Sequence, residues 1–546
     1  MLTVGIYGVA DRLGSQSAHD HALAIVRDGQ VLASIELERV TGRKHDSRLG
    51  AHFEQLLDPW LDPGERVRFV QANSFLGASF ATPDGSLVLE CTNAVPLEPQ
   101  LVPTAIQLQG RLAALRANAF TVSHELAHIG SCLPFLEALE PLTLLVHIDG
   151  GASVSACSVW WWDGVELSCI HHSWRDLKDV VNNFNDSQLT AQVLGIGLDQ
   201  HLSMPGKLMG LAAHGAVDSR LSSVVVENGY FLASRWRSGD PLAACCQALG
   251  IERPPDPSRS AVGQSIAACL QAAFEESVVE FLATWKRRTG ARHLCYAGGA
   301  ALNVVANTRI ENELGFETVT IPPVPSDCGL ALGAAAIAEW IDGRHVRCDS
   351  PYLARTAPCS TPTPITASDA RELNEAAATL AAGGIVASIG DPAEAGPRGL
   401  GHRSLLARTD NVRLRRRLSE EIKLREWYRP VAPMMLREVA EQALEGFRTS
   451  TRLARFMLGA WRVAPAWSAA FAGCVHADGT VRAQIVDPAV PGQAGLAALL
   501  RRLRDEHNVH ALINTSLNLR GAPMSADISV AVRVAQQLRV DAIWCP

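Results

Sequence analysis

The chain has 546 residues, which predicts roughly three or four domains of about 150 residues each. It is 47% hydrophobic, enough for sizeable cores, and its formal charge of −7 argues against a nucleic-acid binder. No apolar run approaches the roughly 18–20 residues of a membrane span, and the start lacks the basic region of a signal peptide. Thirteen scattered cysteines without CxxC pairs are typical of reduced thiols, so we expect a soluble cytoplasmic enzyme.

Two segments of the first half share one design. TVGIYGV is followed by HALAIVRDGQVLASIELERV, where Asp28 and Gly29 form a turn signal between two apolar runs. The segment PLTLLVHIDGGASVSACSVWWWDG again predicts a strand, an Asp-Gly-Gly turn and a strand. The tryptophans of that segment, 160–162, are expected to pack in the core and the hairpin.

Two histidines lie one helical turn apart in HELAHIGSCLPF, at His124 and His128. Positions i and i+4 share one face of a helix, so both imidazoles point the same way. Asp149 in HIDGGAS and Asp327 in PSDCGLALGAA each stand beside glycines, where a backbone can approach a phosphate closely. Two His and two Asp can bind one divalent metal, so this set predicts a metal that holds a nucleotide phosphate.

Later segments add strand–glycine–helix units. RHLCYAGGAALNVVANTRI predicts a strand, a turn at Gly298 and Gly299, and a helix whose N-terminus suits a phosphate. DCGLALGAAAIAEWI predicts a helix packed through small residues. With the two strand–turn units, these segments predict a duplicated α/β fold that binds a nucleotide between its halves.

Composition changes at VRCDSPYLARTAPCSTPTP, residues 346–364, which is rich in proline and poor in large apolar residues. We place a linker at 351–364, between a domain of residues 1–350 and a domain of residues 365–546. The second domain carries cations and small polar donors in glycine-broken loops and strands. They are Arg398, Arg403, Lys423, Arg425, Arg429, His476, Asp478, Arg482, Asn514, Ser516 and Asn518. Such a set suits an anionic, oxygen-rich ligand.

The whole chain resembles the NodU/CmcH-type O-carbamoyltransferases. The resemblance rests on motifs in one order: HDHALAIV, ELERVTGRKHD, HELAH, HIDGGAS, GKLMGLAAHG, YAGGAALN, PSDCGLALGAA, GPRGLGHRSLLA, LREWYRPVAP, HADGTVRAQ and INTSLNLRGAP. It implies an N-terminal domain of the actin/sugar-kinase/heat-shock-chaperone superfamily and a C-terminal YrdC-like α/β domain. It further implies that the C-terminal domain makes carbamoyladenylate from carbamoyl phosphate and ATP, and that the N-terminal domain passes the carbamoyl group to a hydroxyl.

The resemblance also implies roles for individual residues. The metal ligands would be His124, His128, Asp149 and Asp327, and His19 would be the base for the acceptor hydroxyl. The nucleotide pocket would be lined by Gly150, Gly151, Lys207, Gly210, Gly298, Gly299 and Asn303. Carbamoyl phosphate and the adenylate would be held by Arg398, Lys423, Arg429, Arg482, Asn514 and Ser516.

The cofactors implied are Fe²⁺, with Mn²⁺ or Zn²⁺ as alternatives for a His/carboxylate site, and Mg²⁺ with ATP. The partners implied are ATP, carbamoyl phosphate and a hydroxylated small molecule such as an antibiotic or sugar, without nucleic acid or membrane. Three positions depart from the family pattern: Asp391-Pro392, Ala522 in place of a glutamate, and His214 in place of a tyrosine.

Two other functions stay open. Enzymes that transfer threonylcarbamoyl to tRNA combine similar domains, although net acidity counts against a tRNA substrate. A non-catalytic ATP-binding scaffold is the second alternative, and the glutamate missing at Ala522 is its main support. Hydrogenase maturation is disfavoured because the CxxC pairs of that enzyme's zinc fingers are absent. The sequence leaves the acceptor and the oligomeric state open.

Overall fold

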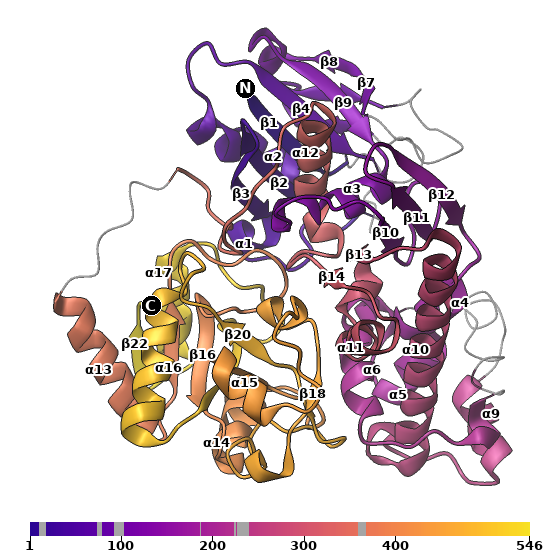
Figure 1. Cartoon of the computed structure of the whole chain (residues 1–546), viewed down its shortest axis with the longest axis vertical. Helices are drawn as coiled ribbons and strands as arrows, with labels where there is room; N and C mark the ends of the chain where they lie inside the picture. The colour runs from indigo at the N-terminus through magenta and orange to yellow at the C-terminus, as the bar shows by residue number, and fades with distance from the viewer. Residues whose placement is uncertain are drawn as a thin grey trace.

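A computed structural model describes residues 1–9, 18–73, 79–91, 103–185, 187–222, 225, 240–358 and 367–546. No helix in these ranges is long and apolar enough to cross a membrane. No disulfide joins any two of the twelve cysteines described there. The described chain forms a mixed α/β structure with three large sheets, two in the first 350 residues and one after them (Figure 1).

The first sheet has six strands in the order β3-β2-β1-β4-β9-β7. Their bounds are β3 Gln30–Glu36, β2 Ala22–Arg27, β1 Leu2–Tyr7, β4 Val67–Ala72, β9 Asn118–Val122 and β7 Thr104–Ala105. β2 and β3 form the predicted hairpin, and Asp28 and Gly29 have φ angles of 49° and 81°. Two consecutive positive φ angles are what a two-residue type I′ hairpin turn requires.

The second sheet repeats this arrangement in the order β12-β11-β10-β13-β14. Its strands are β12 Leu167–Ser173, β11 Cys157–Trp162, β10 Thr143–Ile148, β13 His293–Ala297 and β14 Thr318–Thr320. In both sheets an antiparallel three-stranded unit continues into two parallel strands. The duplication that the two Asp-Gly turns predict is therefore present. Trp160 is fully buried in β11, as expected.

Helices surround the two sheets. Those of the first part are α1 Leu37–Thr41, α2 Leu49–Leu57, α3 His124–Gly130, α4 Lys178–Asn185, α5 Gln188–Leu194, α6 Met204–Ala212, α9 Pro241–Leu249, α10 Ala261–Thr289, α11 Val304–Glu313 and α12 Leu330–Ile341. The longest, α10, begins where the Ser260 side chain accepts a hydrogen bond from Gly263 and ends at Gly290, which has φ 70°. A hydroxyl N-cap and a left-handed glycine are the usual signals for these two ends.

Small residues bring α12 close to the first sheet and to α3. A Cβ added to Gly333 would lie 1.7 Å from the carbonyl oxygen of Ala127, and one added to Gly5 would lie 1.9 Å from that of Ala331. Helix α12 therefore packs backbone to backbone against α3 and β1, which only glycine permits at these points. This contact aligns α3, and hence its two histidines, with the turn before α12.

The third sheet has six strands in the order β20-β17-β21-β16-β15-β22. They are β20 Gln484–Val486, β17 Ala432–Leu436, β21 Ala511–Ser516, β16 Arg403–Arg408, β15 Val386–Ile389 and β22 Ala542–Trp544. The accompanying helices are α13 Ala367–Ala381, α14 Val412–Arg416, α15 Arg437–Ala443, α16 Ala494–His507 and α17 Ile528–Gln537. Figure 1 shows this part beside α5, α6 and α10, below the first sheet.

Buried polar contacts join the C-terminal part to the first sheet. Arg39 forms a fully buried ion pair with Glu36 at 2.8 Å, and its guanidinium also donates to the carbonyl of Gly396. The carboxylate of Glu36 accepts the backbone N–H of Gly396. Residues 359–366 lie outside the described residues, so only 351–358 of the predicted linker 351–364 are described.

Candidate functional site

The four predicted metal ligands meet between the two sheets of the first part. Ser123 caps α3 by accepting the backbone N–H of Leu126 at 3.1 Å, and the helix then presents His124 and His128 one turn apart. The Nε2 atoms of His124 and His128 lie 3.4 and 3.5 Å from Asp327 Oδ1. His128 Nε2 also lies 3.7 Å from Asp149 Oδ2, at the end of β10.

This donor set fits a divalent metal. Both ring nitrogens of His124 and Nε2 of His128 are buried without a hydrogen-bond partner among the described residues. Two ligands each about 2.1 Å from one metal stand about 3.4 Å apart at a tetrahedral angle, close to the observed spacings. Buried, unpaired nitrogens facing carboxylates at such spacings are expected of a metal site. These four residues would hold the ion.

The ligands have their own supporting contacts. Tyr7 donates its hydroxyl to Asp327 Oδ2 at 2.8 Å, and His128 Nδ1 donates to the carbonyl of Pro325 at 3.1 Å, which leaves Nε2 for the metal. Burial lowers the pKa of His124, but Asp327, Glu125 and Asp149 together outweigh burial and raise that pKa overall. Burial raises the pKa of Asp327, but His124, His128 and His19 together hold it well below its usual range.

His147 is a member of this cluster that sequence reasoning missed. Its ring stacks on His128 at 4.9 Å between centroids, and with His128 and Asp149 it forms a second group of converging ligand atoms. Burial and the nearby His128 lower its pKa well below the usual value. The signal was its position two residues before Asp149 in HIDGGAS, on the same side of β10 as that carboxylate.

The predicted glycines surround Asp149. Its carboxylate accepts the backbone N–H groups of Gly150 and Gly299, and Gly151 follows directly. Gly298 has φ 95°, and a Cβ there would lie 2.1 Å from the carbonyl oxygen of Ile148. The two glycine turns thus meet at Asp149, and a side chain at Gly298 would push them apart.

Asn303, Lys207 and Gly210 have structural contacts of their own. Asn303 caps α11 by accepting Ala306 N–H and exchanges amide hydrogen bonds with Gln271 of α10 at 3.0 and 3.2 Å. Lys207 and Gly210 of α6 lie against the C-terminal part: Lys207 Nζ is 3.1 Å from Glu426, and a Cβ on Gly210 would lie 3.5 Å from Tyr428 O. The structure therefore brings Lys207 and Gly210 to the junction of the two parts, whereas Asn303 joins α11 to α10.

A cluster of cations lies on the C-terminal side of that junction; Lys423 is buried and the arginines are half-buried. We call Arg398, Lys423, Arg425, Arg429 and Arg482 the cation cluster. Burial, and to a smaller extent the charges of neighbouring arginines, lowers the pKa of Arg398 to about 10 and that of Arg425 to about 9. The same causes lower the pKa of Arg482 well below its usual range. Arg425, which the sequence placed among the cations that suit an anionic ligand but the resemblance did not assign to carbamoyl phosphate, belongs to this cluster.

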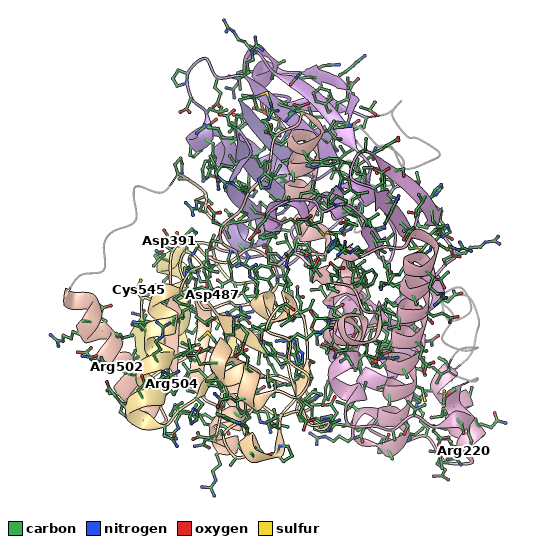
Figure 2. The ribbon with its side chains drawn as sticks, in the orientation of Figure 1. Arg220, Asp391, Asp487, Arg502, Arg504 and Cys545 are labelled. Atoms are coloured by element: carbon green, nitrogen blue, oxygen red, sulfur yellow. The ribbon has the colours of Figure 1, made fainter. Side chains whose placement is uncertain are left out.

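These cations have few anionic partners. In the described chain Arg398, Arg425 and Arg482 form no ion pair, and Nε of Arg398 and of Arg482 is buried without an acceptor. Arg429 lies 3.5 Å from Glu426. By contrast, Arg502 and Arg504, on the outer face of the C-terminal part in Figure 2, pair with Glu506 at 3.0 Å and Glu438 at 2.8 Å. Half-buried charges without partners, with buried Nε atoms that lack an acceptor, indicate an anionic ligand.

Lys423 is fixed to the strand end that carries the predicted polar ligands. Its Nζ donates to Ser516 O at 2.7 Å and to the backbone and side-chain oxygens of Asn518. Burial, then Arg425, Arg429 and Lys44, lower its pKa to about 6. Asn514 donates to Gly399 O at 3.0 Å, while its Oδ1 is buried without a described partner.

His19 lies in the field of the metal-ligand carboxylates. Burial lowers its pKa, but the hydrogen bond to Asp20 and the charges of Asp327, Asp20 and Asp149 raise it to about 9. His19 Nδ1 is 2.8 Å from Asp20, whose other oxygen is 2.7 Å from His45 Nδ1. His19 is thus beside the His/Asp cluster, as the predicted role requires.

Two of the positions that depart from the family pattern, His214 and Ala522, lie near the same junction. His214 packs edge-on against Trp427 at 4.7 Å and His476 at 5.2 Å between ring centroids, so it joins the two parts through aromatic contacts. The carbonyl of Ala522 accepts the side chain of Asn518, and its backbone N–H donates to Leu519 O at 3.2 Å. The polar group that holds Lys423 is therefore maintained without a glutamate at that position.

Comparisons with known proteins agree with the motif order. Residues 186–336 match the family profile described as Carbamoyltransferase N-terminus, and residues 377–546 match Carbamoyltransferase C-terminus. Nodulation protein U of Azorhizobium caulinodans is 30% identical, covering 98% of this chain and 98% of that protein. Nodulation protein U of Rhizobium tropici is 26% identical, covering 97% and 94%.

Solved structures are more distant. Component A of the Acidaminococcus fermentans (R)-2-hydroxyglutaryl-CoA dehydratase is 14% identical with a TM-score of 0.33, covering 63% of this chain and all of that one. Full-length HypF in its phosphate- and nucleotide-bound form is 15% identical with a TM-score of 0.32, covering 63% and 56%. The two family profiles and the full-length relatives are decisive, and on them the chain belongs to the carbamoyltransferase family.

Proposed function

We propose that this carbamoyltransferase is ATP-dependent and moves the carbamoyl group of carbamoyl phosphate, through carbamoyladenylate, to a hydroxyl of a small-molecule natural product such as an antibiotic or sugar. The C-terminal part acts as a YrdC-like activation domain, and the duplicated N-terminal part, of the actin-like superfamily, carries out transfer. Over the two steps one water is consumed, and phosphate, pyrophosphate and AMP leave.

The cation cluster is the observation that carries the proposal. Arg398, Arg425 and Arg482 are half-buried without a described ion-pair partner, the Nε atoms of Arg398 and Arg482 are buried without an acceptor, and such charges are costly unless an anion joins them. Carbamoyl phosphate and the phosphates of ATP supply that charge, and guanidinium groups bind phosphate oxygens in pairs. Preorganised cations also stabilise the charge that develops as pyrophosphate departs.

The His/Asp cluster suits the transfer step. The proposed cofactor is Fe²⁺, with Mn²⁺ or Zn²⁺ as alternatives, and Mg²⁺ accompanies ATP; a metal here would act as a Lewis acid toward phosphate oxygens. The backbone turns at Gly150, Gly151, Gly298 and Gly299 allow close approach of the adenylate. Lys207, Gly210 and Asn303 border the junction across which it passes.

His19 is the proposed base for the acceptor hydroxyl. A positioned base typically contributes about 10²–10⁴-fold. The charges of Asp327 and Asp149 contribute to the raised pKa of His19, and a divalent cation between them would offset both, which favours the neutral imidazole. A junction that joins activation to transfer also keeps carbamoyladenylate from water.

The test is carbamoyl-phosphate-dependent release of pyrophosphate and AMP. The full chain, loaded in turn with Fe²⁺, Mn²⁺ or Zn²⁺, is incubated with ATP and carbamoyl phosphate, with and without a panel of hydroxylated natural products. We expect turnover in the wild type and in Arg502→Ala, a surface control, and its loss in Arg429→Ala. No carbamoyl-phosphate-dependent turnover with any metal would contradict the proposal and favour an ATP-binding scaffold.

A further inference from the structure

One carboxylate next to the site is shared between two histidines. Asp20 Oδ2 lies 2.8 Å from His19 Nδ1, and Asp20 Oδ1 lies 2.7 Å from His45 Nδ1. The side chains of His19 and His45 are 27% and 33% exposed, whereas that of Asp20 is 18% exposed. The acid is therefore covered by two rings that themselves reach the surface of the site.

The backbone holds this arrangement in an uncommon conformation. Asp20 has φ 59° and His45 has φ 56°, in the left-handed region that side-chain-bearing residues rarely adopt. Residues kept in that region cluster at functional sites, where the surrounding structure enforces them. Here the enforcing contacts are the His45 N–H donated to Glu38 at 2.9 Å and the His21 N–H donated to Asp46 O at 3.2 Å.

One chain of contacts and one charge interaction place the arrangement between the two halves of the site. The ring of His21, directly after Asp20, packs edge-on against Tyr7 at 6.0 Å between centroids, and the Tyr7 hydroxyl donates to Asp327 at 2.8 Å. Lys44, directly before His45, is among the charges that lower the pKa of Lys423 in the cation cluster. A group bound between the metal ligands and the cation cluster would thus meet these histidines.

We infer that Asp20 is a positioning residue that holds His19 and His45 as a His–Asp–His set facing the acceptor hydroxyl. Asp20 accepts an Nδ1–H from each ring, which leaves Nε2 of His19 as the acceptor of the hydroxyl proton. As that O–H bond breaks, the oxygen bonds to the carbamoyl carbon and the bond from that carbon to AMP breaks. Asp20 stays ionised and stabilises the imidazolium, and the proton then passes to solvent.

His45 has a distinct part in this set. By occupying the second oxygen of Asp20 it fixes the rotation of the carboxylate, so the first oxygen stays on His19. The inference rests on the proposed function for the identity of the step. The bonding pattern itself is testable without an acceptor.

The test is the tautomer of each ring, read by ¹⁵N NMR of the full chain labelled with [¹⁵N]histidine and loaded with Zn²⁺. Above pH 9, where neutral rings are populated, we expect Nδ1–H for both His19 and His45. Asp20→Asn presents one oxygen and one NH₂ group, so one of the two rings should change to Nε2–H. Asp20→Ala should remove the Nδ1–H preference of both.

His171 provides an internal standard, because its ring should carry the proton on Nε2 and not on Nδ1. Its Nε2, not Nδ1, lies 2.8 Å from Asp176, so it should be an Nε2–H ring in every Asp20 variant. Asp176→Asn is the matched control and should alter His171 alone. An Nε2–H ring at His19 in the wild type would overturn the inference, even if the Asp20 variants failed to fold.

Two other results are equally informative. Loss of both Nδ1–H signals on adding Zn²⁺ would mean that the set binds metal, and would overturn a positioning role. Pyrophosphate release dependent on carbamoyl phosphate is measured on the same wild-type preparation. Its absence would contradict the proposed function while leaving the tautomer result to decide the inference.

Discussion

Lys207 Nζ and Glu426 Oε1, 3.1 Å apart, join the α6 helix of the N-terminal part to the cation cluster of the C-terminal part. The other oxygen of Glu426 is 3.5 Å from Arg429. In the described chain Glu426 is the only carboxylate that pairs with a cluster arginine. Glu426 thus links Lys207, proposed to contact the nucleotide, to Arg429, proposed to contact carbamoyl phosphate. A phosphate bound here would compete with Glu426 for both cations.

Glu426→Gln should therefore tighten binding of inorganic phosphate several-fold, because Lys207 and Arg429 lose their competing anion. The cost to stability should be modest, about 1 kcal/mol or less for a partly exposed pair. Calorimetric titration with inorganic phosphate measures the affinity. The control is Glu420→Gln, which removes a carboxylate 3.6 Å from Arg416 on the surface. This substitution should leave the phosphate affinity unchanged. Weaker binding in Glu426→Gln would show that the ion pair builds the anion site.

Phosphate binding should also draw a proton onto Lys423. Burial, Arg425, Arg429 and Lys44 lower its pKa to about 6, so near pH 7.5 the free protein holds it mostly neutral. A bound phosphate raises that pKa, so binding takes up protons above about pH 6, and the uptake fades near pH 5, where Lys423 is already charged.

Titrations of inorganic phosphate in buffers of different ionisation enthalpy count those protons. Lys423→Met should reduce the uptake near pH 7.5 by roughly one proton. The matched control is Lys286→Met, since Lys286 donates to Gly315 O on the surface of α10. Equal uptake in wild type and Lys423→Met would contradict this account of the cation cluster.

Tyr7→Phe should weaken metal binding about 10–100-fold, because the tyrosine hydroxyl orients Asp327 from outside the ligand set. Competition with a chromophoric chelator gives the metal affinity. Tyr296→Phe is a matched control: that tyrosine is also fully buried, in β13, but its hydroxyl has no hydrogen bond in the described chain. The same affinity in both variants would mean that Tyr7 does not support the site.

Local signals in the sequence predicted much of this architecture. Asp28-Gly29 defined a hairpin, and the i, i+4 spacing of His124 and His128 gave one helix face, because both depend on neighbours along the chain. To predict that Asp149 and Asp327 lie close together, the order of strands in the sheets is also needed, and the family resemblance supplied it. The metal itself and the roles of these residues stay predictions.

Other features could not be read from the sequence. Helix packing across the two parts decides that Lys207 reaches Glu426, and no spacing rule expresses that contact. His147 was not singled out, because its partner His128 lies on another element. Arg425 was placed among the cations that suit an anionic ligand, but its position beside Arg398 and Arg429 depends on the folded chain.

Gly333→Ala should lower both the stability of the fold and the affinity for metal, although it adds only one methyl group. The added methyl would overlap the carbonyl of Ala127 at 1.7 Å, so α3 and α12 must separate. Overpacking of this kind typically costs about 1–3 kcal/mol. Chemical denaturation should show that loss, and metal affinity should fall too, because His124 and His128 lie on α3 and Asp327 directly precedes α12.

Gly206→Ala is the control: no atom lies within 4 Å of the added Cβ, and alanine in a helix should gain about 0.5–1 kcal/mol of stability. If Gly333→Ala were as stable as wild type, the backbone contact between these helices would not be what aligns the two halves of the metal site.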